Sequence, residues 1–133
     1  MDYCLELIVV PVADMDRAKA FYSERVGFTV DVDHRAGEDF RVIQLTPSGS
    51  ACSVTLMRDA EHAGAVQGLH LVVSDIEAAV ADLASRGVEV SEPFHFGERG
   101  RTPGLDPQRR SYGSFASFGD PDGNGWLVQE VRR

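Results

Sequence analysis

The chain has 133 residues and a formal net charge of −8, with 43% hydrophobic and 26% charged residues. This composition is typical of a globular protein that is long enough to bury most of its apolar surface in one compact domain. The acidic balance argues against a nucleic-acid partner, because a phosphate-binding surface needs clustered Lys and Arg, and no apolar run approaches the roughly 20 residues that span a bilayer.

The first half of the chain predicts one strand, one helix and three further strands. An apolar run ends at Asp14, and apolar residues then recur at the spacing of one helical face. Gly27 leads into segments that alternate apolar and polar residues and are separated by turn-forming residues. The predicted elements are a strand over 5–12, a helix over 15–25, and strands over 28–34, 40–46 and 52–57.

The second half repeats this order after a polar stretch rich in small residues, 58–67, which we interpret as a linker. Val73-Ser74-Asp75 corresponds to Val12-Ala13-Asp14, and Asp75 is placed to cap the helix that follows it. The predicted elements are a strand over 69–73, a helix over 76–86, and strands over 88–94, 112–118 and 126–131. The sequence therefore predicts a single domain over 1–133, with one module at about 1–57 and a second at about 68–133.

A long insertion, 95–110, separates two strands of the second module. Three glycines, two prolines and little periodicity predict a loop, and loops of this length in a compact domain are often functional. Its arginines are Arg99, Arg101, Arg109 and Arg110, against Glu98 and Asp106, which gives the insertion a local charge of +2. We interpret it as a candidate lid whose guanidinium groups pair with an anionic ligand, with a solvated loop as the alternative.

Two βαβββ modules predict an α+β fold in which paired curved sheets surround a cleft. Because strand side chains alternate between faces, one face of each sheet packs on its own helix and the other lines the cleft. The side chains expected in the cleft are Leu7, Val9, His70, Val72, Leu127 and Gln129. Glu130 has the opposite parity to Leu127 and is expected at the surface or at the end of the sheet, and Asp120 and Asp122 are expected in a hairpin turn.

Segments 12–18, 21–22 and 27–28, then 73–75, 78–80 and 86–90, and finally 120–124 form one joint pattern along the chain. This pattern resembles the vicinal oxygen chelate superfamily, which includes glyoxalases, bleomycin resistance proteins and extradiol dioxygenases. The resemblance covers nearly the whole chain and implies the fold above. It does not choose among functions, because this fold hosts isomerases, dioxygenases, thiol transferases and drug-binding proteins.

Metal-dependent members of that superfamily hold one divalent ion between His, Glu or Gln side chains from four strands. The resemblance places these positions at Leu7, Gly68 and Leu127, and near Val54 or Thr55. Leucine and glycine side chains offer none of the O or N donors that Mg²⁺, Fe²⁺ or Zn²⁺ needs. We therefore expect no cofactor, and a divalent metal is disfavoured. His70 and Gln129, each two residues further along, leave a displaced site as the alternative.

The resemblance implies a protein that binds a small organic molecule in a largely apolar cleft. The alternative is a lyase, isomerase or dioxygenase-like enzyme that uses a displaced metal, or metal-free acid–base chemistry with His70 as the candidate catalytic residue. The residues predicted to bind the ligand are Leu7, Val9, His70, Val72, Arg99, Arg101, Leu127 and Gln129. The resemblance also implies a homodimer.

The N-terminus and the two cysteines indicate in which cellular compartment the protein is expected. The first residues have no basic n-region, so we expect no signal peptide. Cys4 and Cys52 lack metal-ligand spacing, and we expect two reduced, buried thiols. Both features favour a cytoplasmic protein.

Overall fold

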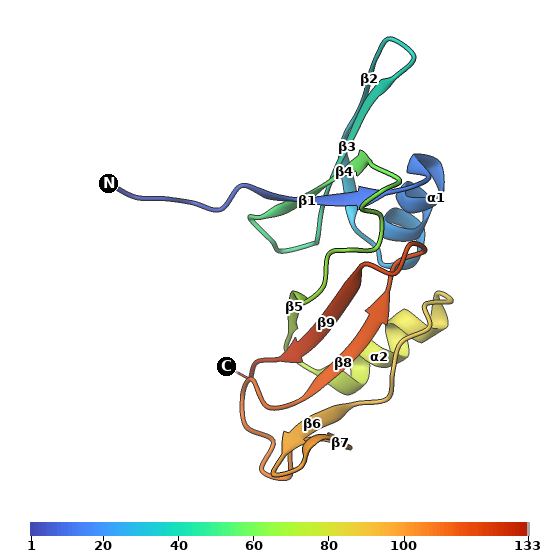
Figure 1. Ribbon diagram of the computed structural model, residues 1–133. Coiled ribbons are helices and arrows are strands. Elements are labelled where there is room, and N and C mark those ends of the chain that lie inside the picture. Colours follow the sequence, from blue (N-terminus) through green and yellow to red (C-terminus); the bar gives the residue numbers. More distant parts are fainter. Residues whose placement is uncertain (133) are drawn as a thin grey trace. The chain divides into compact units, whose positions relative to one another are not determined.

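The computed structural model describes residues 1–132, which form two compact units with one sheet each (Figure 1). The first unit comprises Met1–Val66 with Asp120–Asn124, and the second comprises Gln67–Gly119 with the residues from Gly125 on. The predicted α+β fold of two βαβββ modules is confirmed. The cleft between the modules stays a prediction. Within residues 1–132 neither helix is long and apolar enough to cross a membrane.

The first unit contains a four-stranded sheet in the order β1-β4-β3-β2, in which β1 and β4 are parallel and the other pairs antiparallel. Its helix begins after Asp14, whose carboxylate accepts a hydrogen bond from the Arg17 amide at 3.0 Å, and its last turn is π-helical. The elements are β1 (Leu7–Val12), α1 (Met15–Ala20), η1 (Phe21–Arg25), β2 (Thr29–Ala36), β3 (Phe40–Thr46) and β4 (Ser53–Arg58).

The second unit contains a five-stranded sheet in the order β5-β9-β8-β6-β7. The order β5-β9-β8-β6 corresponds to the order β1-β4-β3-β2 of the first sheet, and β5 and β9 are parallel as β1 and β4 are. Asp75 caps α2 as the sequence predicts, accepting the Glu77 and Ala78 amides at 3.1 Å each. The elements are β5 (Leu69–Val73), α2 (Ile76–Ser85), β6 (Phe94–Gly97), β7 (Gly100–Pro103), β8 (Phe115–Gly119) and β9 (Gly125–Glu130).

The predicted strand over 88–94 is wrong for 88–93, and the predicted loop over 95–110 is wrong for the strand residues 95–97 and 100–103. The segment before Phe94 touches β8 through the Ser91 amide, which donates to the Ser117 carbonyl at 2.9 Å, but it forms no continuous ladder. Pro93 has no N–H to donate, so pairing begins only at Phe94. The insertion itself then forms the β6–β7 hairpin, and Gly100 supplies a left-handed conformation, φ 93°, directly after its turn.

A buried hydrogen-bond network closes the first unit around the turn Asp120–Asn124. The Tyr22 hydroxyl donates to the Asp120 carboxylate at 2.7 Å, and the Asn124 amide donates to the same carboxylate at 2.8 Å and to the Pro11 carbonyl at 2.9 Å. The Asn124 side-chain oxygen accepts the Val66 amide at 3.1 Å. The turn is therefore confirmed, and its polar side chains also satisfy backbone groups of the unit.

We predict that Tyr22→Phe lowers the free energy of unfolding by about 1.5–3 kcal/mol, because a buried carboxylate loses one of its donors. Urea denaturation monitored by circular dichroism measures this value. Tyr3→Phe is the matched control, since Tyr3 is 89% exposed and its hydroxyl is not part of the network. A Tyr22→Phe protein as stable as the Tyr3→Phe protein would show that the network contributes nothing.

Candidate functional site

Four of the predicted ligand-binding residues share one face of the second sheet. In the parallel β5–β9 pair, His70 lies beside Leu127 and Val72 beside Gln129. Alternation along the strands puts Trp126, Val128 and Glu130 on the opposite face, and all three are buried. His70 and Val72 are exposed, with Val72 at 55%. The structure thus leaves an apolar patch with two polar side chains open on one face.

The imidazole of His70 is oriented by the backbone next to it. Its Nδ1 lies 2.8 Å from the Gly68 carbonyl oxygen. A carbonyl only accepts, so Nδ1 carries the proton in the neutral ring and Nε2 carries the lone pair. The side chain is therefore prepared to accept a hydrogen bond from a ligand at Nε2.

Leu7 and Val9 belong to the first unit, on β1. They pair with Ser53 and Thr55 of β4, and Val9 is half exposed while its neighbours Val10 and Val12 are fully buried. The structure confirms that Val9 lies on the face away from the core. That Leu7 and Val9 share one site with His70 stays a prediction.

The four arginines of the insertion do not form one cationic cluster. Arg110 pairs with Asp106 at 2.9 Å, and the hydrogen bonds from Arg110 lower the pKa of Asp106 to about 2. Arg109 pairs with Glu130, and Arg101 lies over the Phe94 ring at 3.7 Å from its centre. Arg109 and Arg110 therefore have carboxylate partners, whereas the predicted ligand-binding residues Arg99 and Arg101 have none within residues 1–132. The remaining arginine, Arg99, is exposed and makes no ion pair within residues 1–132.

Glu130 is the last residue of β9, at the end of the sheet as expected, but the alternative of a surface position is wrong, because its side chain is fully buried. Its carboxylate accepts two hydrogen bonds from Arg109, Nε at 2.8 Å and Nη2 at 2.9 Å, and a third from the Ile76 amide at 2.9 Å. The hydrogen bond from Arg109 lowers the pKa of Glu130. Its parity could have revealed this, since Glu130 shares a face with Trp126 and Val128, where a carboxylate needs a buried partner.

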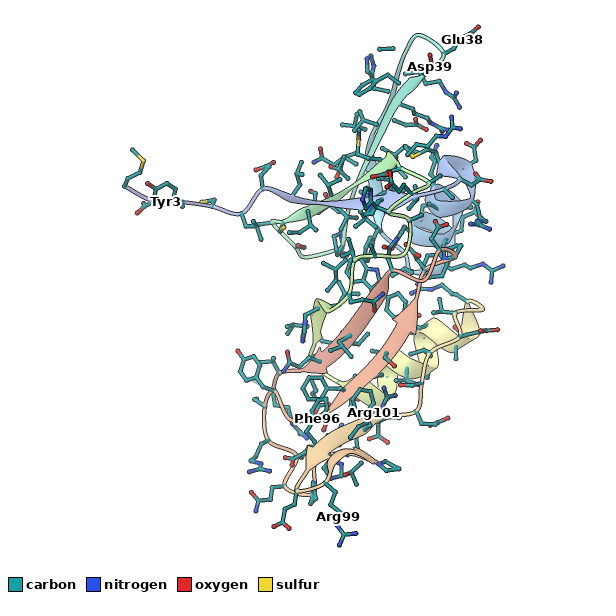
Figure 2. All side chains as sticks on the ribbon, viewed as in Figure 1. Tyr3, Glu38, Asp39, Phe96, Arg99 and Arg101 are labelled. Carbon is teal, nitrogen blue, oxygen red and sulfur yellow. The ribbon has the colours of Figure 1, made fainter. Side chains whose placement is uncertain are left out.

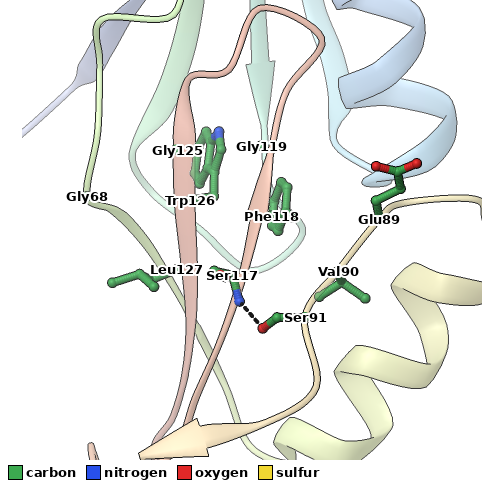
Figure 3. A pocket seen from close by; sticks show the side chains of 10 residues that line it. All are labelled: Gly68, Glu89, Val90, Ser91, Ser117, Phe118, Gly119, Gly125, Trp126 and Leu127. Atoms are coloured by element: carbon green, nitrogen blue, oxygen red, sulfur yellow. Dashed lines mark hydrogen bonds between the residues drawn. The ribbon is translucent and has the colours of Figure 1, made fainter. Parts of the chain in front are cut away.

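Two of the hollows on the second unit are relevant to a candidate site. One, of about 520 Å³, is bordered by Leu127, Ser117 and Glu89, with the rings of Phe118 and Trp126 beside it (Figure 3). The other, of about 350 Å³, is bordered by the rings of Phe96, Tyr112 and Phe115. Figure 2 shows Phe96 next to Arg101, its partner in the β6–β7 pair. Both volumes fall within the range of small-molecule sites.

The residues at the superfamily's metal positions do not fit a divalent ion. Leu7, Gly68 and Leu127 carry no donor, and Thr55 offers one neutral hydroxyl whose oxygen is buried and has no hydrogen-bond partner. No three His, Cys, Asp or Glu side chains in residues 1–132 lie together as metal ligands. One hydroxyl is not a coordination sphere for Mg²⁺ or Zn²⁺.

Comparisons with known proteins agree with this fold. The sequence model of the Glyoxalase/Bleomycin resistance protein/Dioxygenase superfamily matches residues 4–128. The uncharacterized protein YetH of Bacillus subtilis (strain 168) is 29% identical over 126 residues, covering 92% of this chain and 94% of that protein.

Two solved structures from Streptomyces sp. CB03234 are also similar. TnmS3, an antibiotic binding protein, superposes with a TM-score of 0.76 at 30% identity, covering 98% of this chain and 97% of the other. A glyoxalase/bleomycin resistance protein superposes with a TM-score of 0.72 at 32% identity, covering 96% of this chain and 100% of the other.

Proposed function

Because the chain belongs to the glyoxalase/bleomycin resistance protein/dioxygenase superfamily, we propose that it is a cytoplasmic protein that binds a small organic molecule without a divalent metal. The observation that carries this proposal is the open face of β5 and β9, which combines the exposed Val72 and the partly exposed Leu127 with one oriented imidazole. A mostly apolar surface with a few placed polar groups is what a small-molecule site usually presents. The antibiotic binding described for TnmS3 supports the same class of function.

The polar groups around this face support a proposal for the chemistry of the ligand. His70 Nε2 accepts, so the ligand carries a hydroxyl, amine or amide donor that meets it. Arg101 is exposed, and its guanidinium stacks on Phe94 rather than pairing with a carboxylate. Its charge therefore stays available for an anionic group. The ligand has an apolar or aromatic body, one donor and one acidic substituent.

A homodimer is the proposed assembly. The N-terminal part of the chain exposes apolar side chains on alternate residues, with Leu5 two-thirds exposed and Val9 half exposed. Exposed apolar rows of this kind mark surfaces that are covered in an assembly. A two-fold pair is the commonest closed arrangement of identical chains.

We predict that His70→Ala weakens binding of the aromatic anion 8-anilinonaphthalene-1-sulfonate (ANS) about 2- to 12-fold, the value of one neutral hydrogen bond. Fluorescence titration measures the Kd. His34→Ala is the matched control, because His34 is an exposed histidine of the first unit.

Arg101→Ala should weaken ANS roughly 10- to 150-fold and leave the uncharged analogue N-phenyl-1-naphthylamine (NPN) unaffected, with Arg99→Ala as the comparison. Unchanged ANS affinity in both His70→Ala and Arg101→Ala would exclude this face as the site.

For metals we predict that millimolar Ni²⁺, Zn²⁺, Fe²⁺ or Mg²⁺ leaves the Tm of the chelator-treated protein unchanged. An ion that bound only the folded chain with submicromolar affinity would stabilise it by roughly 4 kcal/mol or more. Thermal scans over a metal concentration series test this. A saturable increase in Tm that His70→Ala removes would instead establish a displaced metal site.

For the assembly we predict a dimer of 14.5 kDa chains at micromolar concentration. Sedimentation velocity measures the mass, and Leu5→Asp should shift the distribution toward the monomer, because a buried carboxylate without a partner opposes association. A wild-type protein that sediments only as a monomer would disprove the proposal.

A further inference from the structure

The loop between β7 and β8 contains two residues in an unusual backbone conformation. Arg109 has φ 51° and Tyr112 has φ 68°, and they are the two non-glycine residues with positive φ in the part of the chain that the structure describes. L-residues other than Gly, Asn and Asp rarely adopt this conformation, because Cβ then crowds the backbone. Such strain persists only where the surroundings hold it, and it is found preferentially at functional sites.

The surroundings of Tyr112 hold its backbone on both sides. The Tyr112 amide donates to the Glu130 carbonyl at 2.7 Å, and the Gln129 side-chain amide donates to the Tyr112 carbonyl at 3.0 Å. Arg109, three residues earlier, makes its two-pronged pair with the Glu130 carboxylate and also lies 3.4 Å from Glu77. Glu130 thus fixes the loop through both its backbone and its side chain.

A second ion pair folds the loop before it reaches Tyr112. The Asp106 carboxylate accepts the Arg110 amide at 2.7 Å and the Arg110 guanidinium at 3.0 and 2.9 Å, and its own amide donates to Ser114 at 3.0 Å. Asp106 and Ser114 are both buried. The loop is therefore held in one conformation, and the two arginines at its centre, Arg109 and Arg110, both pair with carboxylates of the protein.

The loop between β7 and β8 exposes the ring of Tyr112 to solvent. Tyr112 is 55% exposed, and it borders the 350 Å³ hollow together with Phe96, which is 59% exposed, and the buried Phe115. The Phe96 and Phe115 rings meet edge to face with their centres 5.1 Å apart. A glycine at 112 would adopt φ 68° without crowding. The fold alone therefore gives no reason for a tyrosine there, whereas an aromatic wall for a ligand does.

We propose that Tyr112 is a wall of a slot that takes a planar, uncharged aromatic ring, and that the Glu130–Arg109 pair positions it. The inference rests on the proposed function, since the slot would hold the aromatic body of the ligand on the same unit as His70. Exposed aromatic rings around a concave surface favour stacking with planar ligands, typically with ring centres about 4.5–7 Å apart. The pairing of Arg110 with Asp106 keeps the rim of the slot neutral.

The test measures NPN binding and urea denaturation together. Tyr112→Gly should weaken NPN about 3- to 10-fold while the denaturation midpoint stays unchanged or rises, and Tyr112→Phe should bind as the wild type does. Tyr3→Gly is the control outside the slot and should bind NPN normally. Unchanged NPN affinity in Tyr112→Gly, or no NPN binding by the wild-type protein, would overturn the slot. The ANS titration of His70→Ala judges the proposed function separately.

The positioning role is tested by a double-substitution cycle. Arg109→Lys replaces a two-pronged guanidinium with an ammonium that cannot make both hydrogen bonds. It should weaken NPN about 3-fold when Tyr112 is present and have no further effect in the Tyr112→Gly protein. Equal weakening in both backgrounds would show that the pair supports the unit in general and does not act through Tyr112. Glu130→Gln is the second variant for the same cycle if Arg109→Lys does not fold.

Discussion

A carboxylate buried on the helix-facing side of a sheet must find donors, and the second unit is arranged around this requirement at Glu130. A buried charge without partners is costly, so the donors have to be supplied by neighbouring elements. The first turn of α2 supplies the Ile76 amide and the β7–β8 loop supplies the Arg109 guanidinium. One side chain thereby connects the end of β9, the start of α2 and the loop whose tyrosine borders a hollow.

The two faces of the second sheet differ in how their polar side chains are paired. Polar groups on the core face are paired within the protein, as Glu130 is with Arg109. On the other face the Nδ1 of His70 is bonded to the Gly68 carbonyl, and Val72 is half exposed. The buried face of β9 is tied to α2 and to the β7–β8 loop, whereas the predicted site residues of β5 and β9 on the other face are at least partly exposed. This separation is consistent with a superfamily in which a shared fold hosts different functions through the residues on its open face.

The sequence predicts this architecture well because its signals are local and periodic. The repeat, the caps at Asp14 and Asp75, and the faces of β1, β5 and β9 follow from spacing alone. The β6–β7 hairpin was missed because glycines and prolines that suggest a loop also suit a tight turn. The partner of Arg109 was missed because Glu130 lies far along the chain, and pairing at that separation leaves no periodic signal. The left-handed φ of Tyr112 likewise depends on contacts with β9 that no local pattern reports.

The turn Asp120–Asn124 has a consequence for how the chain is made. It belongs to the first unit, although the last strand of that unit, β4, ends at Arg58. When the ribosome has released only residues up to Val66, the Tyr22 hydroxyl, the Pro11 carbonyl and the Val66 amide still lack the side chains that satisfy them. The first half can reach its final state only after nearly the whole polypeptide has emerged. The two modules are thus copies in sequence, but a gene split or fusion junction placed between them would not yield two independent proteins.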